Sequence, residues 1–177
     1  MIAAIERPRI STERLTLRAL SLADAPRLAR LANDFEVVKT TGGMPFPYTE
    51  ENARASVRRA EAADPEREQF FAIDLAGEGP IGTIAFYATG EVGPEVGYWL
   101  GRPHWGLGLG SEALGAAMGW ARDAWNKRCI VACHHVGNDV SGQMLIRAGF
   151  LYTGKVELKP CRARGENVDC RWMVWLA

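Results

Sequence analysis

The chain has 177 residues with 21 basic and 21 acidic side chains, so its formal net charge is zero. This length most simply makes one domain, residues 1–177, which can bury a core without disulfides or metals. The balanced charge leaves no electrostatic footprint for nucleic acid or for an anionic membrane. We therefore expect a globular protein that binds neither.

The cysteines and the N-terminus indicate where the protein works. Cys129, Cys133, Cys161 and Cys170 have neither C-x-x-C spacing nor the density of a disulfide scaffold. Cys129 and Cys133 share one face of a predicted strand as small apolar side chains, which argues against a metal site. The N-terminus lacks a signal-peptide pattern, and no run approaches the ~18 apolar residues of a membrane span. These features predict a cytoplasmic protein without a metal.

The first part of the chain has signals for one strand and two helices. Residues 15–20 alternate as a strand, and Ser21 is a favourable N-cap for the first helix. A second helix is predicted over residues 49–64, with Pro65 as its stop. The loop at 42–48 is rich in Pro and Gly and holds two aromatic side chains. These side chains either line a substrate site or pack over the core.

The remainder of the chain predicts six more strands and two more helices. A hairpin is expected first, followed by a strand, a helix, a strand, a helix and two closing strands. In chain order the strands are 69–75, 81–87, 95–100, 128–133, 150–157 and 169–176, and the helices follow residue 110 and span 138–148. The pattern of about seven strands and about four helices predicts a mixed α/β sheet flanked by helices.

Three alternate glycines, Gly106, Gly108 and Gly110, lie between the strand 95–100 and an amphipathic helix. Such a loop presents unpaired N–H groups and the positive end of the helix dipole, which attract an anion such as a pyrophosphate. A Walker loop would need Lys and then Ser or Thr after its last glycine, and a dinucleotide fingerprint would need G-x-G-x-x-G. Neither pattern is present, and the glycines alone fit an ordinary tight turn equally well.

Three blocks of the chain resemble the GNAT family of acetyl-CoA-dependent N-acetyltransferases. They are residues 95–100, 105–114, and 137–141 leading to 148–150. The resemblance runs over residues 14–176 and is closest to the branch that acetylates ribosomal-protein N-termini. It implies a mostly antiparallel mixed sheet in which two parallel strands splay apart to hold acetyl-CoA.

The resemblance also implies which residues bind the cofactor. The pantetheine arm of acetyl-CoA would lie along strand 95–100, and its pyrophosphate would bind the glycine loop. The implied cofactor-binding residues are Trp99, Leu100, Trp105, Gly106, Leu107, Gly108, Leu109, Gly110, Ser111 and Asn138. A simple helix N-cap is the alternative interpretation of Asn138, and one residue can serve both purposes. Glu112 lies beside the expected pyrophosphate, so we expect it to point away and to be structural.

The family chemistry needs a neutral amine to attack a thioester. A base must therefore take a proton from an ammonium whose pKa is about 8 for an α-amine and about 10.4 for lysine. We expect Glu95, at the start of the splayed strand among apolar neighbours, to accept this proton directly or through water. A solvated carboxylate at a strand end is the alternative interpretation. His134 and His135 are given no role.

Many relatives carry a Tyr in the helix that follows Asn138, where it is the acid for the leaving thiolate. Leu145 stands at the corresponding position of this chain. Ser141, about one helical turn after Asn138, is therefore the substitute hypothesis. A serine has little acidity of its own, so we expect it to hydrogen-bond the sulfur or to orient the cofactor.

The sequence thus predicts transfer of acetyl from acetyl-CoA to a primary amine by direct attack in a ternary complex. A protein N-terminal α-amine is the favoured acceptor, and a small-molecule amine is the alternative. A CoA-binding module without turnover and a mononucleotide-binding protein are alternatives of other classes. We expect a monomer or a homodimer.

Overall fold

The computed structural model describes residues 7–89 and 92–177. Residues 1–6 and 90–91 of the domain expected over 1–177 lie outside the described residues. Within the described residues, no helix is long and apolar enough to cross a membrane.

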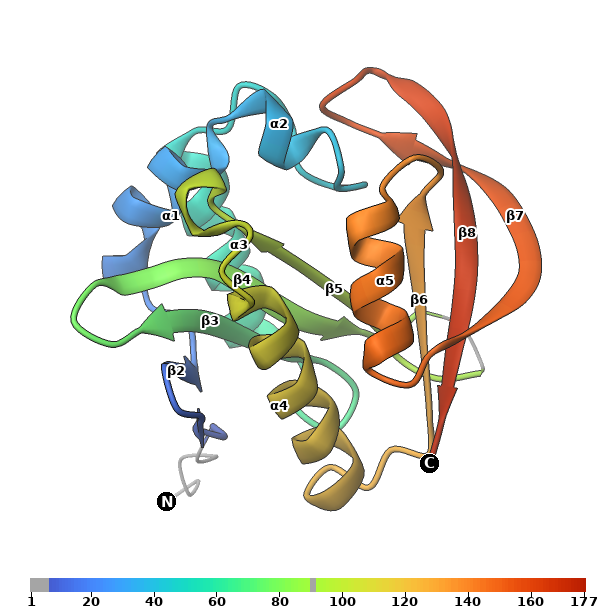
Figure 1. Ribbon diagram of the computed structural model, residues 1–177. Coiled ribbons are helices and arrows are strands. Elements are labelled where there is room, and N and C mark those ends of the chain that lie inside the picture. Colours follow the sequence, from blue (N-terminus) through green and yellow to red (C-terminus); the bar gives the residue numbers. More distant parts are fainter. Residues whose placement is uncertain (1–6, 90–91) are drawn as a thin grey trace.

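The described residues form one mixed sheet with the strand order β1-β2-β3-β4-β5-β6-β8-β7 (Figure 1). In chain order the strands are β1 (Ile10–Ser11), β2 (Leu15–Arg18), β3 (Gln69–Leu75), β4 (Gly79–Tyr87), β5 (Glu95–Leu100), β6 (Cys129–His135), β7 (Leu151–Cys161) and β8 (Glu166–Leu176). Every neighbouring pair is antiparallel except β5 and β6. The mostly antiparallel mixed sheet predicted from the sequence is confirmed, with eight strands in these residues instead of about seven.

Helices cover both faces of this sheet. They are α1 (Ala25–Ala32), α2 (Phe35–Val38), α3 (Glu50–Ala62), α4 (Leu109–Asp123) and α5 (Asp139–Arg147), and two short 3-10 turns, Leu22–Asp24 and Arg102–His104, precede α1 and α4. Helix α1 packs against α3, and α4 packs against α5 (Figure 1). Since successive strand residues point to opposite faces, β4 contributes Phe86 to the core beneath α4 and Ala85 to a cluster with Ala60 of α3.

Two differences from the predicted elements have local causes. The described residues hold five α-helices instead of about four, because Asp34 accepts a hydrogen bond from the Glu36 N–H (3.0 Å) and starts the single turn α2. The closing hairpin is longer than predicted, since β7 and β8 stay paired up to Cys161 and Glu166. Lys159 and Pro160 break the apolar alternation there, although an edge strand tolerates both residue types.

Strands β5 and β6 are the feature that positions the site. They pair only where Glu95 faces Val131, beside a 2.9 Å hydrogen bond from the Val131 N–H to the Pro94 carbonyl. Beyond this point β5 stays paired with β4 up to Leu100, and β6 stays paired with β8. Among the described residues, the edge of β5 that faces β6 therefore has no strand partner over residues 96–100. This is the splayed parallel pair that the family resemblance implies.

Candidate active site

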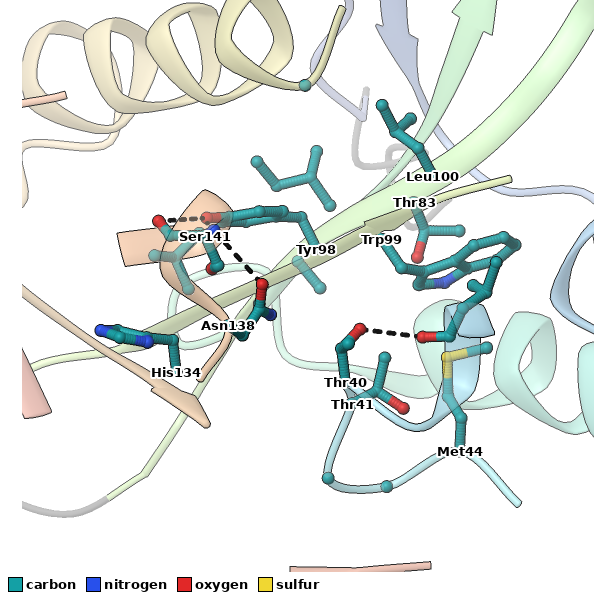
Figure 2. A pocket seen from close by; sticks show the side chains of 18 of the residues that line it. Thr40, Thr41, Met44, Thr83, Tyr98, Trp99, Leu100, His134, Asn138 and Ser141 are labelled. Carbon is teal, nitrogen blue, oxygen red and sulfur yellow. Dashed lines mark hydrogen bonds between the residues drawn. The ribbon is translucent and has the colours of Figure 1, made fainter. Parts of the chain in front are cut away.

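A cavity of about 1390 Å³ lies at the splay between β5 and β6. Side chains that alternate along β5 divide it into two halves. Tyr98 points toward α5 and Trp99 points the opposite way, toward Met44 (Figure 2). We call the half beside α4 and α5 the donor half, and the half beside α2 and α3 the acceptor half.

The glycine loop closes one end of the donor half. Gly106 and Gly108 have φ values of 74° and 76°, which glycine adopts far more readily than other residues. A Cβ on Gly110 would lie 2.8 Å from Cε of Met144. Among the described residues, no protein group accepts a hydrogen bond from the backbone N–H groups of residues 106–111. These N–H groups, at the N-terminus of α4, suit the pyrophosphate of CoA.

The other side chains of the loop take different positions. The Trp105 indole N–H donates to the Leu100 carbonyl (2.8 Å) and so ties the loop to the end of β5. Leu107 is exposed, and its carbonyl accepts a hydrogen bond from Arg14 (2.9 Å). Leu109 is buried in the core, so its backbone is the part that can contact a ligand.

Glu112 points away from the loop, as expected. Its carboxylate accepts hydrogen bonds from the Thr12 hydroxyl (2.6 Å) and the Arg14 N–H (3.0 Å), and it forms an ion pair with the Arg14 guanidinium. Burial opposes ionisation, but these partners lower the pKa of Glu112 below its ordinary value. Glu112 therefore fastens the N-terminal strands to α4.

The N-terminus of α5 brings two polar side chains to the donor half, where they meet Tyr98 of β5 (Figure 2). Asn138 caps the helix by accepting from the Ser141 N–H (3.4 Å), and its side-chain amide N–H groups have no partner among the described residues. The hydroxyls of Ser141 and Tyr98 lie 2.9 Å apart. Leu145 is fully buried in the core, so this position supplies no acid.

Glu95 lies in the acceptor half beside charges that the sequence did not reveal. Its carboxylate accepts hydrogen bonds from Nζ of Lys159 (3.3 and 3.4 Å) and from Sγ of Cys133 (3.3 Å). The expectation of apolar neighbours is therefore wrong, because β7 brings an ammonium group to the start of β5. Burial, followed by the Glu95 charge, raises the pKa of Cys133 to about 12 and keeps it a thiol.

Lys159 is held in this position by two further contacts. Its ammonium lies 4.5 Å from the ring centre of Trp172, and it donates to Sγ of Cys133 (3.4 Å). Burial disfavours the ammonium, but its interactions with Cys133 and with the Glu95 carboxylate outweigh burial and raise the pKa of Lys159. Glu95 is thus an ion-paired base candidate.

Aromatic and small polar side chains complete the acceptor half. Trp99 packs beside Met44 and Tyr48, and the Tyr48 hydroxyl lies 3.2 Å from the Ser56 hydroxyl. Of the two aromatics in the loop 42–48, Tyr48 is buried against the core and lines the cavity, whereas Phe46 is exposed. Tyr48 therefore fits both interpretations, and Phe46, which does not line the cavity, fits neither.

His134 and His135 line the same cavity and are both buried. His134 is engaged through Nε2 with the Tyr152 hydroxyl (2.9 Å). Burial lowers the pKa of His135, which favours the neutral ring. We assign neither histidine a chemical step.

The sequence patterns did not identify three residues that contact Ser141 or Glu95, namely Tyr98, Cys133 and Lys159. Strand alternation would have placed Tyr98 on the face opposite Trp99. Lys159 follows Glu95 by 64 residues, and no local pattern joins them. Its position is a property of the folded hairpin.

A family model described as the acetyltransferase (GNAT) domain matches residues 14–151 of this chain. The protein belongs to the GNAT acetyltransferase family. It is accordingly an acetyl-CoA-dependent N-acetyltransferase. The family that the sequence blocks resemble is confirmed.

Individual relatives agree with this assignment. The chain is 31% identical to the uncharacterized N-acetyltransferase p20 of Bacillus licheniformis over 162 residues, which are 89% of this chain and 90% of p20. It is also 35% identical over 77 residues to the ribosomal-protein-serine acetyltransferase of Escherichia coli strain K12, 42% of each chain. The expected likeness to the ribosomal-protein branch of the GNAT family is thus found.

Solved GNAT structures share the fold. Mycobacterium smegmatis RimJ in complex with CoA-disulfide has a TM-score of 0.84 at 19% identity, covering 97% of this chain and 88% of that chain. The spermidine N-acetyltransferase of Vibrio cholerae, in complex with CoA and spermine, has a TM-score of 0.77 at 19% identity, covering 93% and 96%. The Escherichia coli relative is named for a ribosomal-protein serine and the Vibrio cholerae enzyme for spermidine, so the shared fold does not choose the acceptor.

Proposed function

We propose that the protein acetylates the α-amine of a protein or peptide N-terminus. The observation that carries this proposal is the division of one cavity by β5, with anion-binding N–H groups in its donor half and ion-paired Glu95 in its acceptor half. The amine and the thioester then meet at the splay, where the amine attacks directly in a ternary complex. No acetylated enzyme intermediate is needed.

In this proposal acetyl-CoA is held mainly by backbone groups. Its pyrophosphate binds the N–H groups of residues 106–111, and Trp99 and Leu100 belong to the free edge of β5 that can hydrogen-bond the amides of the pantetheine arm. The free amide N–H groups of Asn138 support a contact with the same arm. Backbone N–H groups of β5 also suit the oxyanion that forms during attack.

Glu95 accepts the proton that the amine loses, directly or through a water molecule. As the C–N bond forms and the C–S bond breaks, the electron pair of the C–S bond goes to sulfur, and Ser141 hydrogen-bonds this sulfur. A carboxylate is a much weaker base than an amine. This weakness favours an acceptor that is already partly neutral.

The basicity of the two candidate protein amines differs widely. With pKa values of about 8 and about 10.4, an α-amine has a neutral fraction near pH 7 that is about 250-fold larger than that of a lysine side chain. A weak base is sufficient for the α-amine only. The ion pair at Glu95 therefore supports an N-terminal acceptor.

The charges of the acceptor half also argue against a polyamine. A polyamine carries several ammonium groups, which would be expected to bind unpaired carboxylates. The described carboxylates that line this half are already ion-paired, in the pairs Glu36–Lys39, Glu68–Arg59 and Glu95–Lys159. The distribution of charge therefore favours an acceptor with a single amine.

Release of the CoA thiol from acetyl-CoA, measured with a panel of amines, tests the proposal. The panel contains peptides with a free N-terminus, the same peptides with a blocked N-terminus, amino acids, spermidine and an aminoglycoside. We expect the free peptides to be the best acceptors and the blocked peptides to be inert. Faster turnover of spermidine or of an aminoglycoside would favour the small-molecule alternative, and tight CoA binding without turnover would favour a binding module.

A further inference from the structure

Two hydroxyl groups from different elements meet in the donor half. Tyr98 extends from β5 and Ser141 from the first turn of α5, and their oxygens lie 2.9 Å apart (Figure 2). Both residues line the cavity. Asn138 fixes the Ser141 backbone through the helix cap, so the pair joins β5 to α5 at the side of the splay.

The number of protons in this pair leaves one hydrogen-bond donor free. Two hydroxyls carry two protons, and one proton is used between the two oxygens. Tyr98 Oη also lies 3.5 Å from the Ser141 carbonyl oxygen, which is long compared with the usual O–H···O distance of about 2.7 Å. When Tyr98 donates to Oγ of Ser141, the Ser141 O–H is directed to a ligand in the cavity, because it has no other acceptor among the described residues.

We propose that Tyr98 is a positioning residue that directs the Ser141 O–H toward the sulfur of CoA as the thiolate leaves. This inference rests on the proposed function, which places the pantetheine arm along β5. The Tyr98 O–H donates to Ser141, and the Ser141 O–H donates to the sulfur. Tyr98 of β5 thus supplies a phenol beside α5, where Leu145 stands at the position at which many relatives carry Tyr.

The step balances without transfer of a proton from either hydroxyl. The amine nitrogen forms its bond to the acetyl carbon and gives its proton to the base in the acceptor half. The electron pair of the broken C–S bond stays on sulfur as a hydrogen-bonded thiolate. Water protonates the thiolate after CoA is released.

The acidity of Tyr98 agrees with donation of a hydrogen bond rather than of a proton. Burial, opposed by the hydrogen bond to Ser141, raises the pKa of Tyr98 to about 12. An ordinary thiol has a pKa of about 8.5, so the phenol is the weaker acid. Tyr98 therefore remains a protonated donor throughout the pH range in which the thiolate forms.

The direct test is the pKa of the CoA thiol in its complex with the protein, measured from the ultraviolet absorbance of the thiolate without an acceptor. A hydrogen bond to the thiolate lowers this pKa, so Tyr98→Phe should raise it by about 0.5 to 1. The same variant should lower kcat about 10-fold and change the KM for acetyl-CoA by less than about twofold. An unchanged thiol pKa in Tyr98→Phe would overturn the inference.

A control and a second variant separate this role from a general structural one. Tyr152→Phe also removes a hydroxyl that is bonded to a side chain near α5, but Tyr152 does not line the cavity. It should leave the thiol pKa and kcat unchanged. Ser141→Ala should raise the thiol pKa at least as much as Tyr98→Phe does, and the double variant should match Ser141→Ala alone.

Independent, additive effects of the two substitutions would contradict action through Ser141. If Tyr98→Phe shows no cooperative thermal unfolding transition and so has not folded, the CoA thiol pKa in complex with Ser141→Ala decides instead. An unchanged thiol pKa in Ser141→Ala would then overturn the inference. Because these measurements need no acceptor, they also separate the two proposals. A thiol pKa that responds to the variants while no amine is acetylated would refute the proposed function alone.

Discussion

Glu95 is the base of the proposed reaction. It is four-fifths buried, and its oxygens face Lys159 and Cys133. The Cys133 thiol is too weak an acid to be ionised at working pH, so it acts as a neutral donor. Lys159 is the charged partner, and its ammonium holds the Glu95 carboxylate in place.

We expect Glu95→Gln to lower kcat/KM about 100-fold, because the amide cannot accept the proton of the amine. The affinity for CoA should stay within about twofold of the original, since Glu95 lies in the other half of the cavity. Steady-state kinetics and calorimetric titration with CoA measure the two quantities.

Glu157→Gln is the matched control, because Glu157 is bonded to Lys155 and Trp172 on the same hairpin but lies outside the cavity. Equal losses in both variants would remove Glu95 from the role of base.

At the scale of elements, the connection from β5 to α4 forms the proposed donor site. Residues 96–100 offer a free strand edge, and the loop after them ends in Gly108, the left-handed N-cap of α4. Arg14 and Glu112 hold the loop against the N-terminal strands. The shape of the donor site is therefore a property of the backbone.

Gly108→Val tests this element. A branched side chain at φ 76° strains the backbone by about 2 kcal/mol and also occupies the loop that the pyrophosphate approaches. We expect the Kd for CoA, measured by calorimetry, to rise at least about 30-fold. Gly115→Ala is the control, because a Cβ added at this position of α4 would have no atom within 4 Å, and it should leave the affinity for CoA unchanged. Unchanged affinity in Gly108→Val would count against the loop as the pyrophosphate site.

Elements with strong local signals were predicted well. Strand β5 has the predicted bounds, and Asn138 begins α5 as the N-cap that its side chain favours. Gly149 ends α5 with a φ of 93°. Strand β1, with two residues, and helix α2, with four, are too short for a periodic pattern, and only their packing defines them.

At the scale of the whole molecule, the site is made of contacts between distant parts of the chain. Lys159 reaches Glu95 because the order β6-β8-β7 folds the last hairpin back toward the splay. Ser141 meets Tyr98 across 43 residues, because α5 packs on the face that Tyr98 occupies. The sequence blocks predicted the splayed strands and the glycine loop before α4. The side chains around the acceptor and the leaving group depend on tertiary packing, which no local pattern encodes.

A peptide acceptor can carry two kinds of amine, its N-terminal α-amine and a lysine side chain. Both would enter an acceptor half whose described carboxylates are ion-paired and whose proposed base is a carboxylate. The α-amine has the advantage of its lower pKa, and a lysine side chain does not.

The most direct measurement is the position of the acetyl group on a peptide that has both a free N-terminus and an internal lysine, after incubation with acetyl-CoA and the protein. Tandem mass spectrometry locates the group. We predict enzyme-dependent acetylation of the N-terminal nitrogen, with the lysine unmodified. Acetylation of the lysine instead, or of neither amine while CoA binds tightly, would contradict the account.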